Sequence, residues 1–250
     1  MVENQGGLDK LFYELANESR LGIMHELQAG ELRLLEIARR LDLTDTETSR
    51  QLQRLSEARL VQKYPNGPYG LTTFAKLLLD ASSLMGFISK NREYFLDHDA
   101  FLLPSEFRAR LGELSNVRTI TSTVETLNYV CEMFRSAEKM IDATVVGMDT
   151  IVDIEIQRLK EGVKVKWLML ETFLPKARSK LCSVEKLPEM RWTPSIFGHV
   201  GVTDKAAILT IKRNDGALSY DAFVGEDPSF LKFAEDLFMH EWEKARPWHP

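Results

Sequence analysis

The feature that most constrains the fold is a helix pattern followed directly by a hairpin pattern, between residues 44 and 72. Thr44, with Glu47 three residues later, is a capping-box pattern that marks the start of a helix. Residues 60–72 then contain two short strand-like segments around a Pro-Asn-Gly-Pro turn, which is typical of a β-hairpin. A chain with this pair of elements needs further helices to bury the apolar side of the first one.

Shorter helix patterns precede this pair, over about 8–15, 20–28 and 32–41. Helices followed by a hairpin are the order of a winged helix-turn-helix. In that fold one helix enters the DNA major groove and the hairpin, or wing, reaches the neighbouring backbone. We therefore expect a winged helix-turn-helix DNA-binding domain over residues 1–72, with double-stranded DNA as its partner.

The predicted recognition helix presents hydrogen-bonding side chains on its polar face. Arg50 and Arg54 lie one turn apart, and an arginine can bind guanine or phosphate through two parallel hydrogen bonds. Gln53 matches adenine, and short hydroxyls near a helix N-terminus suit phosphates. The predicted DNA-binding residues are Thr46, Ser49, Arg50, Gln53 and Arg54 on the helix, with Lys63 and Asn66 on the wing.

The overall charge of the chain is not typical of a nucleic-acid-binding protein. The net charge is -5, so DNA binding requires a local basic surface rather than a field from the whole protein. Two exposed arginines with Glu57 beside them are also compatible with an ordinary solvated helix face. A winged helix that binds another protein is therefore a second hypothesis for this half of the chain.

The segment TSRQLQRLSEARLVQKYPNGPYGLT resembles the recognition helix and wing of ArsR- and MarR-type winged-helix regulators. The resemblance covers roughly residues 10–90 and implies DNA binding. Arg59 is a departure, because the regulators usually have glycine at this position, where the chain leaves the helix. A metal-sensing version is not expected, since this half has no cysteine and one histidine, His25.

A long helix pattern follows over residues 73–97, which we assign to a linker and dimerisation helix. Its apolar residues are spaced 4, 3, 4 and 3 apart, which is a short heptad seam of the kind that pairs two helices. Packing within the chain would give nearly the same pattern and remains an alternative. The predicted dimerisation residues are Phe74, Leu78, Ala81, Met85 and Ile88.

From about residue 98 the pattern changes to alternating strands and helices, and Pro228 opens a final helix. His98, between Asp97 and Asp99, is interpreted as a linker residue. We expect an α/β domain with a mixed sheet over residues 98–250. The predicted fold class of the whole chain is α+β: a winged helix-turn-helix, a linking helix and this α/β domain. The clearest strand patterns are Val163–Leu170, Gly198–Thr203, Ala206–Lys212 and Ala217–Val224.

The stretch FGHVGVTDKAAIL places His199 in an apolar strand, five residues before Asp204. This strand-Asp-turn-strand pattern, with the order of elements over about 115–245, resembles the phospholipase D-like domain that follows a winged helix in archaeal TrmB-like and methanogenesis regulators. Enzymes of that superfamily use a His-x-Lys strand with an Asp five residues further on. Aligning Asp204 places Phe197 at the nucleophile position and His199 at the lysine position. The resemblance therefore implies a non-enzyme, with a phosphodiesterase as the alternative.

Without catalysis, such a domain is expected to bind a small-molecule effector or to support oligomerisation, because the resemblance implies a cleft shaped for a phosphate or a sugar. The candidate ligand-binding residues are Arg191, Trp192 and His199. Arg191 could take an anion and Trp192 could stack on a flat ligand. Their structural alternatives are a surface ion pair for the arginine, core packing for the tryptophan and a satisfied sheet residue for the histidine.

Composition excludes several other classes. The two cysteines, Cys131 and Cys182, lie far apart and form no metal-binding cluster, and no glycine-rich phosphate loop occurs, so neither a metal nor a cofactor is expected. No apolar run reaches the ~18 residues of a membrane span. The first residues do not look like a secretory signal. We expect a cytoplasmic homodimer that binds DNA and an effector and does not associate with membranes.

Overall fold

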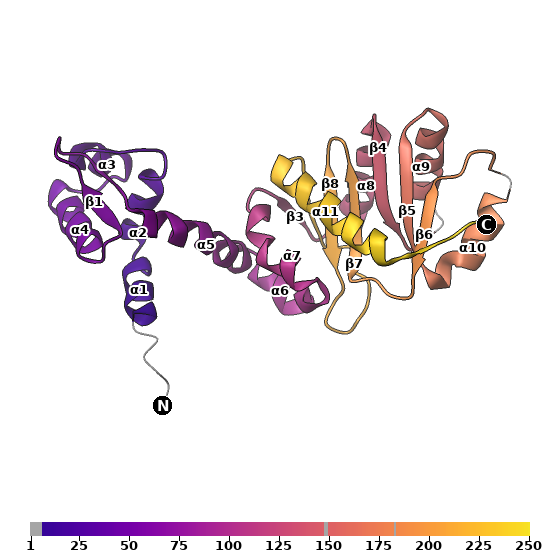
Figure 1. Ribbon diagram of the computed structural model, residues 1–250, viewed down its shortest axis with the longest axis horizontal. Coiled ribbons are helices and arrows are strands. Elements are labelled where there is room, and N and C mark those ends of the chain that lie inside the picture. Colours follow the sequence, from indigo (N-terminus) through magenta and orange to yellow (C-terminus); the bar gives the residue numbers. More distant parts are fainter. Residues whose placement is uncertain (1–6, 148–149, 183) are drawn as a thin grey trace. The chain divides into compact units, whose positions relative to one another are not determined.

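The computed structural model describes residues 7–147, 150–182 and 184–250. The chain divides into two compact units, of which the first unit runs to Ser82 and the second unit begins at Ser83 (Figure 1). The boundary falls inside the segment predicted as a linker, within helix α5 (Thr73–Lys90).

The first unit is a bundle of helices with a two-stranded hairpin. Its inward-facing leucines, isoleucines and methionine form a single core, to which α4 contributes Leu52 and Leu55. The strands pair antiparallel, with Val61 opposite Leu71. This is the predicted winged helix-turn-helix. Its elements are α1 (Leu8–Leu15), α2 (Glu18–Glu26), α3 (Leu34–Arg40), α4 (Asp45–Glu57), β1 (Val61–Lys63), β2 (Tyr69–Leu71) and the start of α5.

The second unit is built on one sheet with helices packed on both faces. Its helices are α6 (Arg92–Asp97), α7 (Ser105–Ala109), α8 (Thr123–Ser136), α9 (Thr150–Lys160), α10 (Leu174–Leu181) and α11 (Pro228–Lys244), with short 3-10 turns at Ala100–Leu102, Leu111–Leu114 and Glu171–Phe173. Its strands are β3 (Arg118–Ile120), β4 (Met140–Val145), β5 (Lys164–Leu170), β6 (Glu189–Thr193), β7 (Gly198–Thr203), β8 (Ala207–Ile211), β9 (Ala222–Gly225) and β10 (Arg246–Pro247).

The sheet is mixed, as predicted, and its strand order is β10-β6-β5-β4-β7-β8-β9-β3. β4, β5 and β6 run parallel because α9 and α10 provide the crossovers between them. β7, β8 and β9 are joined without an intervening helix and pair antiparallel. The predicted α+β fold class is therefore confirmed.

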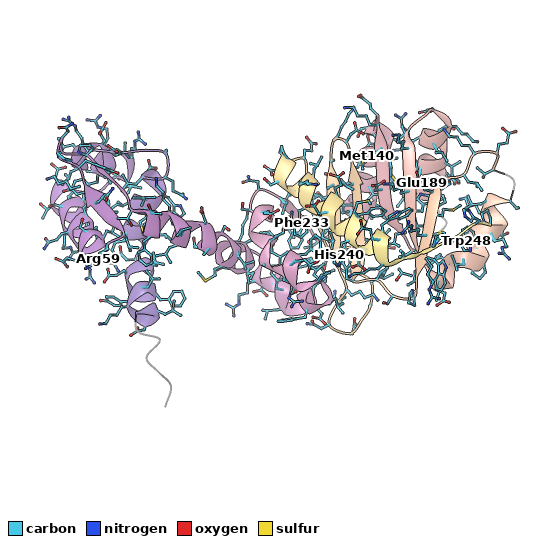
Figure 2. All side chains as sticks on the ribbon, viewed as in Figure 1. Arg59, Met140, Glu189, Phe233, His240 and Trp248 are labelled. Atoms are coloured by element: carbon cyan, nitrogen blue, oxygen red, sulfur yellow. The ribbon has the colours of Figure 1, made fainter. Side chains whose placement is uncertain are left out.

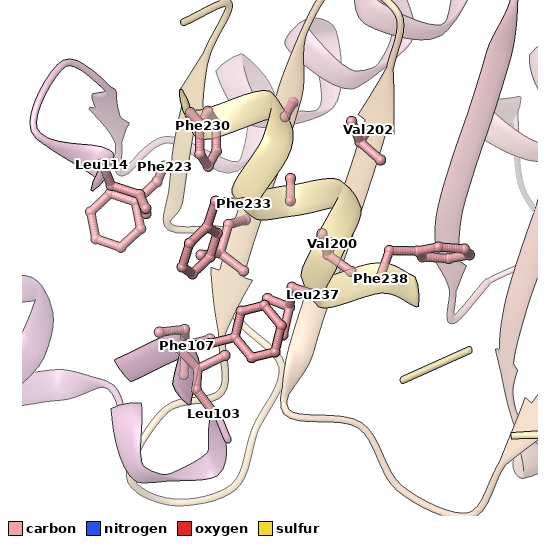
Figure 3. Packing of buried hydrophobic residues seen from close by; sticks show 14 of the residues in the cluster. Leu103, Phe107, Leu114, Val200, Val202, Phe223, Phe230, Phe233, Leu237 and Phe238 are labelled. Carbon is pink, nitrogen blue, oxygen red and sulfur yellow. The ribbon is translucent and has the colours of Figure 1, made fainter. Parts of the chain in front are cut away.

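Each face of the sheet has its own apolar core. On one face, α11 packs Phe233 and Leu237 against β7, as Figure 3 shows with Val200 and Val202 of that strand. On the other face, α8, α9 and α10 cover β4 and β5, with the fully buried Trp167 at the centre of this core. Successive side chains of a strand point to opposite faces of the sheet, so one strand contributes residues to both cores.

The predicted linker helix does not form one separate element. It breaks near Asn91, whose side-chain amide donates to the carbonyl of Phe87, and it continues as α6. Phe87 and Tyr94 are buried in the core of the second unit, next to Phe223. The second unit therefore begins earlier than residue 98, because aromatic side chains of the predicted linker complete its core.

Across the residues that the structure describes, no helix combines the length and apolar character needed to cross a membrane.

Candidate nucleic-acid interface and ligand cavity

Helix α4 is positioned by its cap and by its apolar side. The Thr44 hydroxyl accepts a hydrogen bond from the Glu47 backbone N–H at 3.1 Å, as the capping-box pattern predicted. Leu52 and Leu55 are buried in the core, so the opposite side of the helix faces outward. That outward side lines a shallow depression formed by Leu34, Asp45, Thr46, Ser49, Arg50 and Gln53.

Arg50 and Gln53, the residues of this surface predicted to contact bases, are each paired with a carboxylate of the same helix. Arg50 pairs with Glu47 at 2.7 Å, and its side chain is 68% exposed. Hydrogen bonds from Arg50, and then from Gln51, lower the pKa of Glu47. Gln53 donates to Glu57 at 3.0 Å. Exposed pairs of this kind are weak, so both side chains can exchange these partners for a nucleic acid.

Arg54 does not share the outward surface, although its spacing from Arg50 predicted that it would. Its guanidinium binds both carboxylate oxygens of Glu14 on α1, at 2.7 Å and 3.3 Å, and lies over the Tyr13 ring. Glu14 also pairs with the buried Arg20 at 3.1 Å. The hydrogen bond from Arg54 lowers the pKa of Glu14, and the same bond raises the pKa of Arg54.

The wing, residues 61–71, carries the two remaining predicted residues. Both Lys63 and Asn66 are exposed. The Lys63 ammonium lies 5.5 Å from the centre of the Tyr69 ring across the hairpin, so the lysine is positioned at the last strand pair before the turn. Asn66 lies in the turn, where Gly67 takes a positive φ of 96°.

Arg59, at the end of α4 (Figure 2), keeps the backbone conformation that glycine usually provides. Its φ is +58°, in the left-handed region. The Leu60 N–H bonds to the Leu55 carbonyl at 2.8 Å and the Arg59 N–H to the Ser56 carbonyl at 3.0 Å, which is a Schellman ending. The turn from helix to wing therefore has the ordinary geometry despite the arginine.

The three residues predicted to line one cleft of the second unit lie apart. Arg191 donates a hydrogen bond to the carbonyl of Trp242 at 2.8 Å and lies over the Trp242 ring. The Arg191 guanidinium is therefore bound to α11. Trp192 packs partly buried under Arg246. Both residues are on β6, which β5 and β4 separate from β7 and His199. The prediction assumed that β6 and β7, which follow each other in the sequence, also lie side by side in the sheet. The crossover connections place β5 and β4 between them.

His199 does line a cavity, of about 120 Å³, enclosed by α8, α9 and the strands β4, β7 and β8. Its backbone N–H donates to the Thr210 hydroxyl at 3.0 Å. Burial lowers the pKa of His199 to about 4, outweighing a hydrogen bond with the Thr144 backbone that raises it. The ring is thus neutral at physiological pH. Sequence patterns did not predict the other polar wall residues, including Thr126, Glu155, Ser219 and Tyr220.

The residues at the positions of the phospholipase D motif have structural roles. Phe197 is buried in the core under α11. Asp204 accepts hydrogen bonds from the backbone N–H groups of Glu138 and Lys139, at 3.0 Å and 2.9 Å. Burial by itself raises the pKa of Asp204, but the backbone hydrogen bonds together have a larger opposite effect, so the pKa is lowered overall. Asp204 therefore ties the β7–β8 turn to the start of β4.

His98, interpreted from the sequence as a linker residue, is only 2% exposed. It stacks on Tyr94 with ring centres 3.9 Å apart. Its Nδ1 lies 2.8 Å from the Tyr94 carbonyl oxygen, and its Nε2 lies 2.9 Å from the Ser219 hydroxyl. Because the carbonyl only accepts, Nδ1 donates the bond to Tyr94. His98 thus fixes the end of α6 to the segment before β9.

Residues 15–63 match a family model described as a helix-turn-helix domain. This match confirms the predicted helix-turn-helix and covers the first unit from the end of α1 through β1. No curated protein matches the chain. Among the described residues, no group of three or more His, Cys, Asp or Glu side chains is arranged to hold a metal ion.

Several solved structures are similar to the chain at low sequence identity. TrmBL2, described as an archaeal chromatin protein with a novel mode of DNA binding, is 19% identical over 96% of this chain and 100% of its own, with a TM-score of 0.46. NucT from Helicobacter pylori is 14% identical over 53% of this chain and 99% of its own, with a TM-score of 0.42. The phospholipase D family member Nuc from Salmonella typhimurium is 14% identical over 54% of this chain and 99% of its own, also at 0.42. TrmB-like and phospholipase D family proteins, which the second half of the sequence resembles, are thus among the matched structures.

Proposed function

We propose that this protein is a dimeric, sequence-specific DNA-binding transcription regulator whose second unit responds to a small molecule. The observation that carries the proposal is the outward surface of α4. It places Thr46, Ser49, Arg50 and Gln53 together, beside an exposed wing, within a helix-turn-helix domain. A helix of this kind fits the major groove, where its early residues meet base edges.

Arg50 is the residue that we propose as the main contact to a base edge. It is the most exposed of the paired arginines of the first unit, at 68% against 39% for Arg54. A guanidinium that leaves Glu47 for guanine gains two parallel hydrogen bonds. Thr46 and Ser49 lie in the first turns of α4, where their hydroxyls and the helix dipole favour phosphate.

The exposed seam of α5 supports the dimer. Phe74, Met85 and Ile88 are 49%, 49% and 41% exposed, whereas Leu79 and Phe87 of the same helix are buried. Leu78 of the seam packs against the core of the first unit, but Phe74, Met85 and Ile88 are left exposed. These three side chains are therefore the part of the heptad seam that a second copy can cover. Such a dimer would present two recognition helices to half-sites about 34 Å apart, or a multiple of that.

The catalytic alternative has no comparable support. Phe197, which has no nucleophilic atom, is buried where the resemblance to phospholipase D enzymes calls for histidine. His199 lines the cavity alone among the three predicted ligand residues.

DNA binding is tested by fluorescence anisotropy on operator fragments selected from random sequence, at several salt concentrations. Arg50→Ala should weaken binding roughly 5- to 150-fold, as expected for loss of one bidentate base contact. Arg135→Ala is the matched control, since Arg135 makes the same type of exposed i,i+3 pair, with Glu132 on α8. Equal effects of the two variants, or affinity independent of salt, would overturn the proposal.

The dimer is tested separately by analytical ultracentrifugation. Met85→Glu places a charge in the seam and should convert dimers to monomers at micromolar concentration. Lys76→Glu also introduces a carboxylate on α5, at an exposed position outside the seam, and should leave the dimer intact. A monomeric wild-type chain, or a dimer insensitive to Met85→Glu, would contradict this part of the proposal.

A further inference from the structure

An apolar groove lies on the surface of the second unit, where the end of α5 lies beside α6 and α7 (Figure 1). Its apolar wall includes Leu84 and Ile88 of α5, Phe95 of α6 and Leu111 of the 3-10 turn after α7. The groove has a volume of about 540 Å³. A Cβ on Gly112 would lie 2.8 Å from the Leu84 backbone nitrogen, so the turn packs directly on α5 and fixes this wall.

Phe101 lies at the groove and is 80% exposed, more than any other large apolar side chain that the structure describes. Its backbone N–H donates to the Asp99 carboxylate at 3.0 Å, and the Arg108 guanidinium lies 4.9 Å from the centre of its ring. Arg108 also donates to the carbonyls of Phe101 and Leu103, at 3.3 Å and 2.6 Å. The ring is therefore held in place without being buried, so it loses little conformational freedom when a partner covers it.

The exposed apolar surface around the groove is large enough for a stable interface. Phe101, Leu102, Met85 and Ile88 are 80%, 43%, 49% and 41% exposed. At roughly 200 Å² for a large side chain, they expose about 400 Å² together. Each partner in a standard interface buries about 800 Å², of which a little more than half is apolar. These four side chains therefore supply most of the apolar area that such an interface needs.

The shape and charge of this surface suit a second copy of the chain. A two-fold contact brings the same surface of two copies together, so the surface must be complementary to itself. A projecting ring beside an apolar groove meets this condition. The charged side chains along the described part of the groove are one acid, Asp99, and one base, Arg108. Across a two-fold axis each can face its opposite, so charge favours the pairing of identical surfaces.

The groove is also continuous with the seam of α5 that we propose for the dimer. Ile88 belongs to both, and Met85 lies one turn before it on the same side of the helix. In a parallel pair of α5 helices, Ile88 of one copy lies opposite Ile88 of the other. The grooves of the two copies then lie at the same end of the seam.

We infer that the dimer interface continues from α5 onto the second unit, where Phe101 of each copy inserts into the groove of the other. The inserted ring contacts Ile88 and Leu111 of its partner. This inference rests on the dimer proposed above and assigns the residue that contributes most to its affinity, since aromatic side chains that enter pockets dominate binding energy.

The first test measures the dimer Kd of the full-length chain by sedimentation velocity. Loss of one such aromatic side chain weakens binding by more than about tenfold, and each dimer loses two, so Phe101→Ser should raise Kd at least about 100-fold. The exposed ring leaves no cavity in the folded chain, so Tm should change by no more than about 4 °C. Val124→Ser is the control, because Val124 is 68% exposed on α8, outside the groove. Equal Kd values for the two variants would overturn the inference.

The second test blocks the groove and keeps the ring. Ala109 lines the groove, is exposed and lies outside the seam. Ala109→Glu should therefore raise Kd as strongly as Phe101→Ser does, and it tests the inference even if Phe101→Ser does not fold. Ser105→Glu is the control, since Ser105 is exposed on the same helix but outside the groove. An unchanged dimer in Ala109→Glu would overturn the inference.

A mixture of the two variants tests whether the insertion is reciprocal. In a mixed dimer, the intact ring of the Ala109→Glu chain meets the open groove of the Phe101→Ser chain, so one of the two insertions survives. Neither variant alone retains an insertion. Native mass spectrometry should therefore show mixed dimers at concentrations where each variant alone is monomeric. Absence of mixed dimers under these conditions would overturn the reciprocal insertion.

The same measurements distinguish this inference from the proposed function. A dimer that Met85→Glu breaks and Phe101→Ser does not would keep the proposed dimer and refute the insertion. A dimer that depends on Phe101, in a chain that binds no DNA, would keep the insertion and refute the regulator. A monomeric wild-type chain would refute both the proposed dimer and the insertion, and the groove would then serve a different partner.

Discussion

Replacing Arg59 with glycine should stabilise the first unit. Arg59 has a φ of +58°, where the side chain of an L-residue crowds its own backbone, and its conformation is imposed by the Schellman ending of α4. The Thr72 hydroxyl donates to the Arg59 carbonyl at 2.8 Å, which further fixes the backbone at this point. Glycine adopts the same conformation without the steric cost.

The size of the effect follows from two opposing terms. An L-residue in the left-handed region costs roughly 1–2 kcal/mol. Glycine returns about 0.5–1 kcal/mol of this through its greater freedom in the unfolded chain. The net stabilisation of Arg59→Gly is therefore about 0.5–1 kcal/mol, which is roughly 2–8 °C in Tm for a domain of 60–100 residues.

The assay has to report on the first unit alone. All four tryptophans lie between Trp167 and Trp248, in the second unit, so tryptophan fluorescence should not change. Native-state hydrogen exchange of the Leu60 amide, which closes the Schellman ending, should slow about two- to fivefold. Arg59→Ala is the control, because it removes the charge and keeps the Cβ, and it should not slow exchange.

Equal slowing in the glycine and alanine variants would refute the reasoning, since it would trace the effect to the arginine side chain rather than to φ. Faster exchange in Arg59→Gly would refute it as well.

Three further predictions concern other parts of the chain. Gly198→Ala should destabilise the second unit by more than about 2 kcal/mol, because the added Cβ would lie 2.1 Å from the backbone oxygen of Thr210; urea denaturation followed by tryptophan fluorescence measures this, and a loss below half that size would contradict it. Burial raises the pKa of Asp142 to about 6, above its unfolded value, so the folded state binds the proton more tightly and stability should increase as pH falls from 7 towards 4; Asp142→Asn should lose this part of the pH dependence, and an unchanged slope would show that another group causes it. Glu14→Gln should release Arg54, tighten DNA binding and steepen the salt dependence by about 0.9 in log–log slope, as for one added phosphate contact; an unchanged slope would mean that the freed guanidinium does not reach the DNA.

The local signals in the sequence were sufficient to predict the helices and the hairpin of the first unit. Thr44 caps α4 and Gly67 turns the wing because capping and turn formation depend on residues three or four positions apart. The strand patterns around Trp167 and Val200 likewise predicted a mixed sheet, since apolar runs bounded by turns depend only on neighbouring residues. The class of fold and the shared face of Thr46, Ser49, Arg50 and Gln53 were therefore available from the sequence alone.

The tertiary structure decided which of those residues meet. Glu14 and Arg54 are 40 residues apart in sequence, and only the tertiary structure brings the Arg54 guanidinium against the carboxylate of Glu14 on α1. His98 and Ser219 are 121 residues apart, and their contact turns a predicted linker residue into a buried one. Glu155 entered no sequence motif, yet it shares a cavity wall with His199 because a crossover helix lies across the sheet. Periodicity assigns a side chain to a face of its own element, but the partner of that face is set by topology, through packing between segments that are remote in the chain.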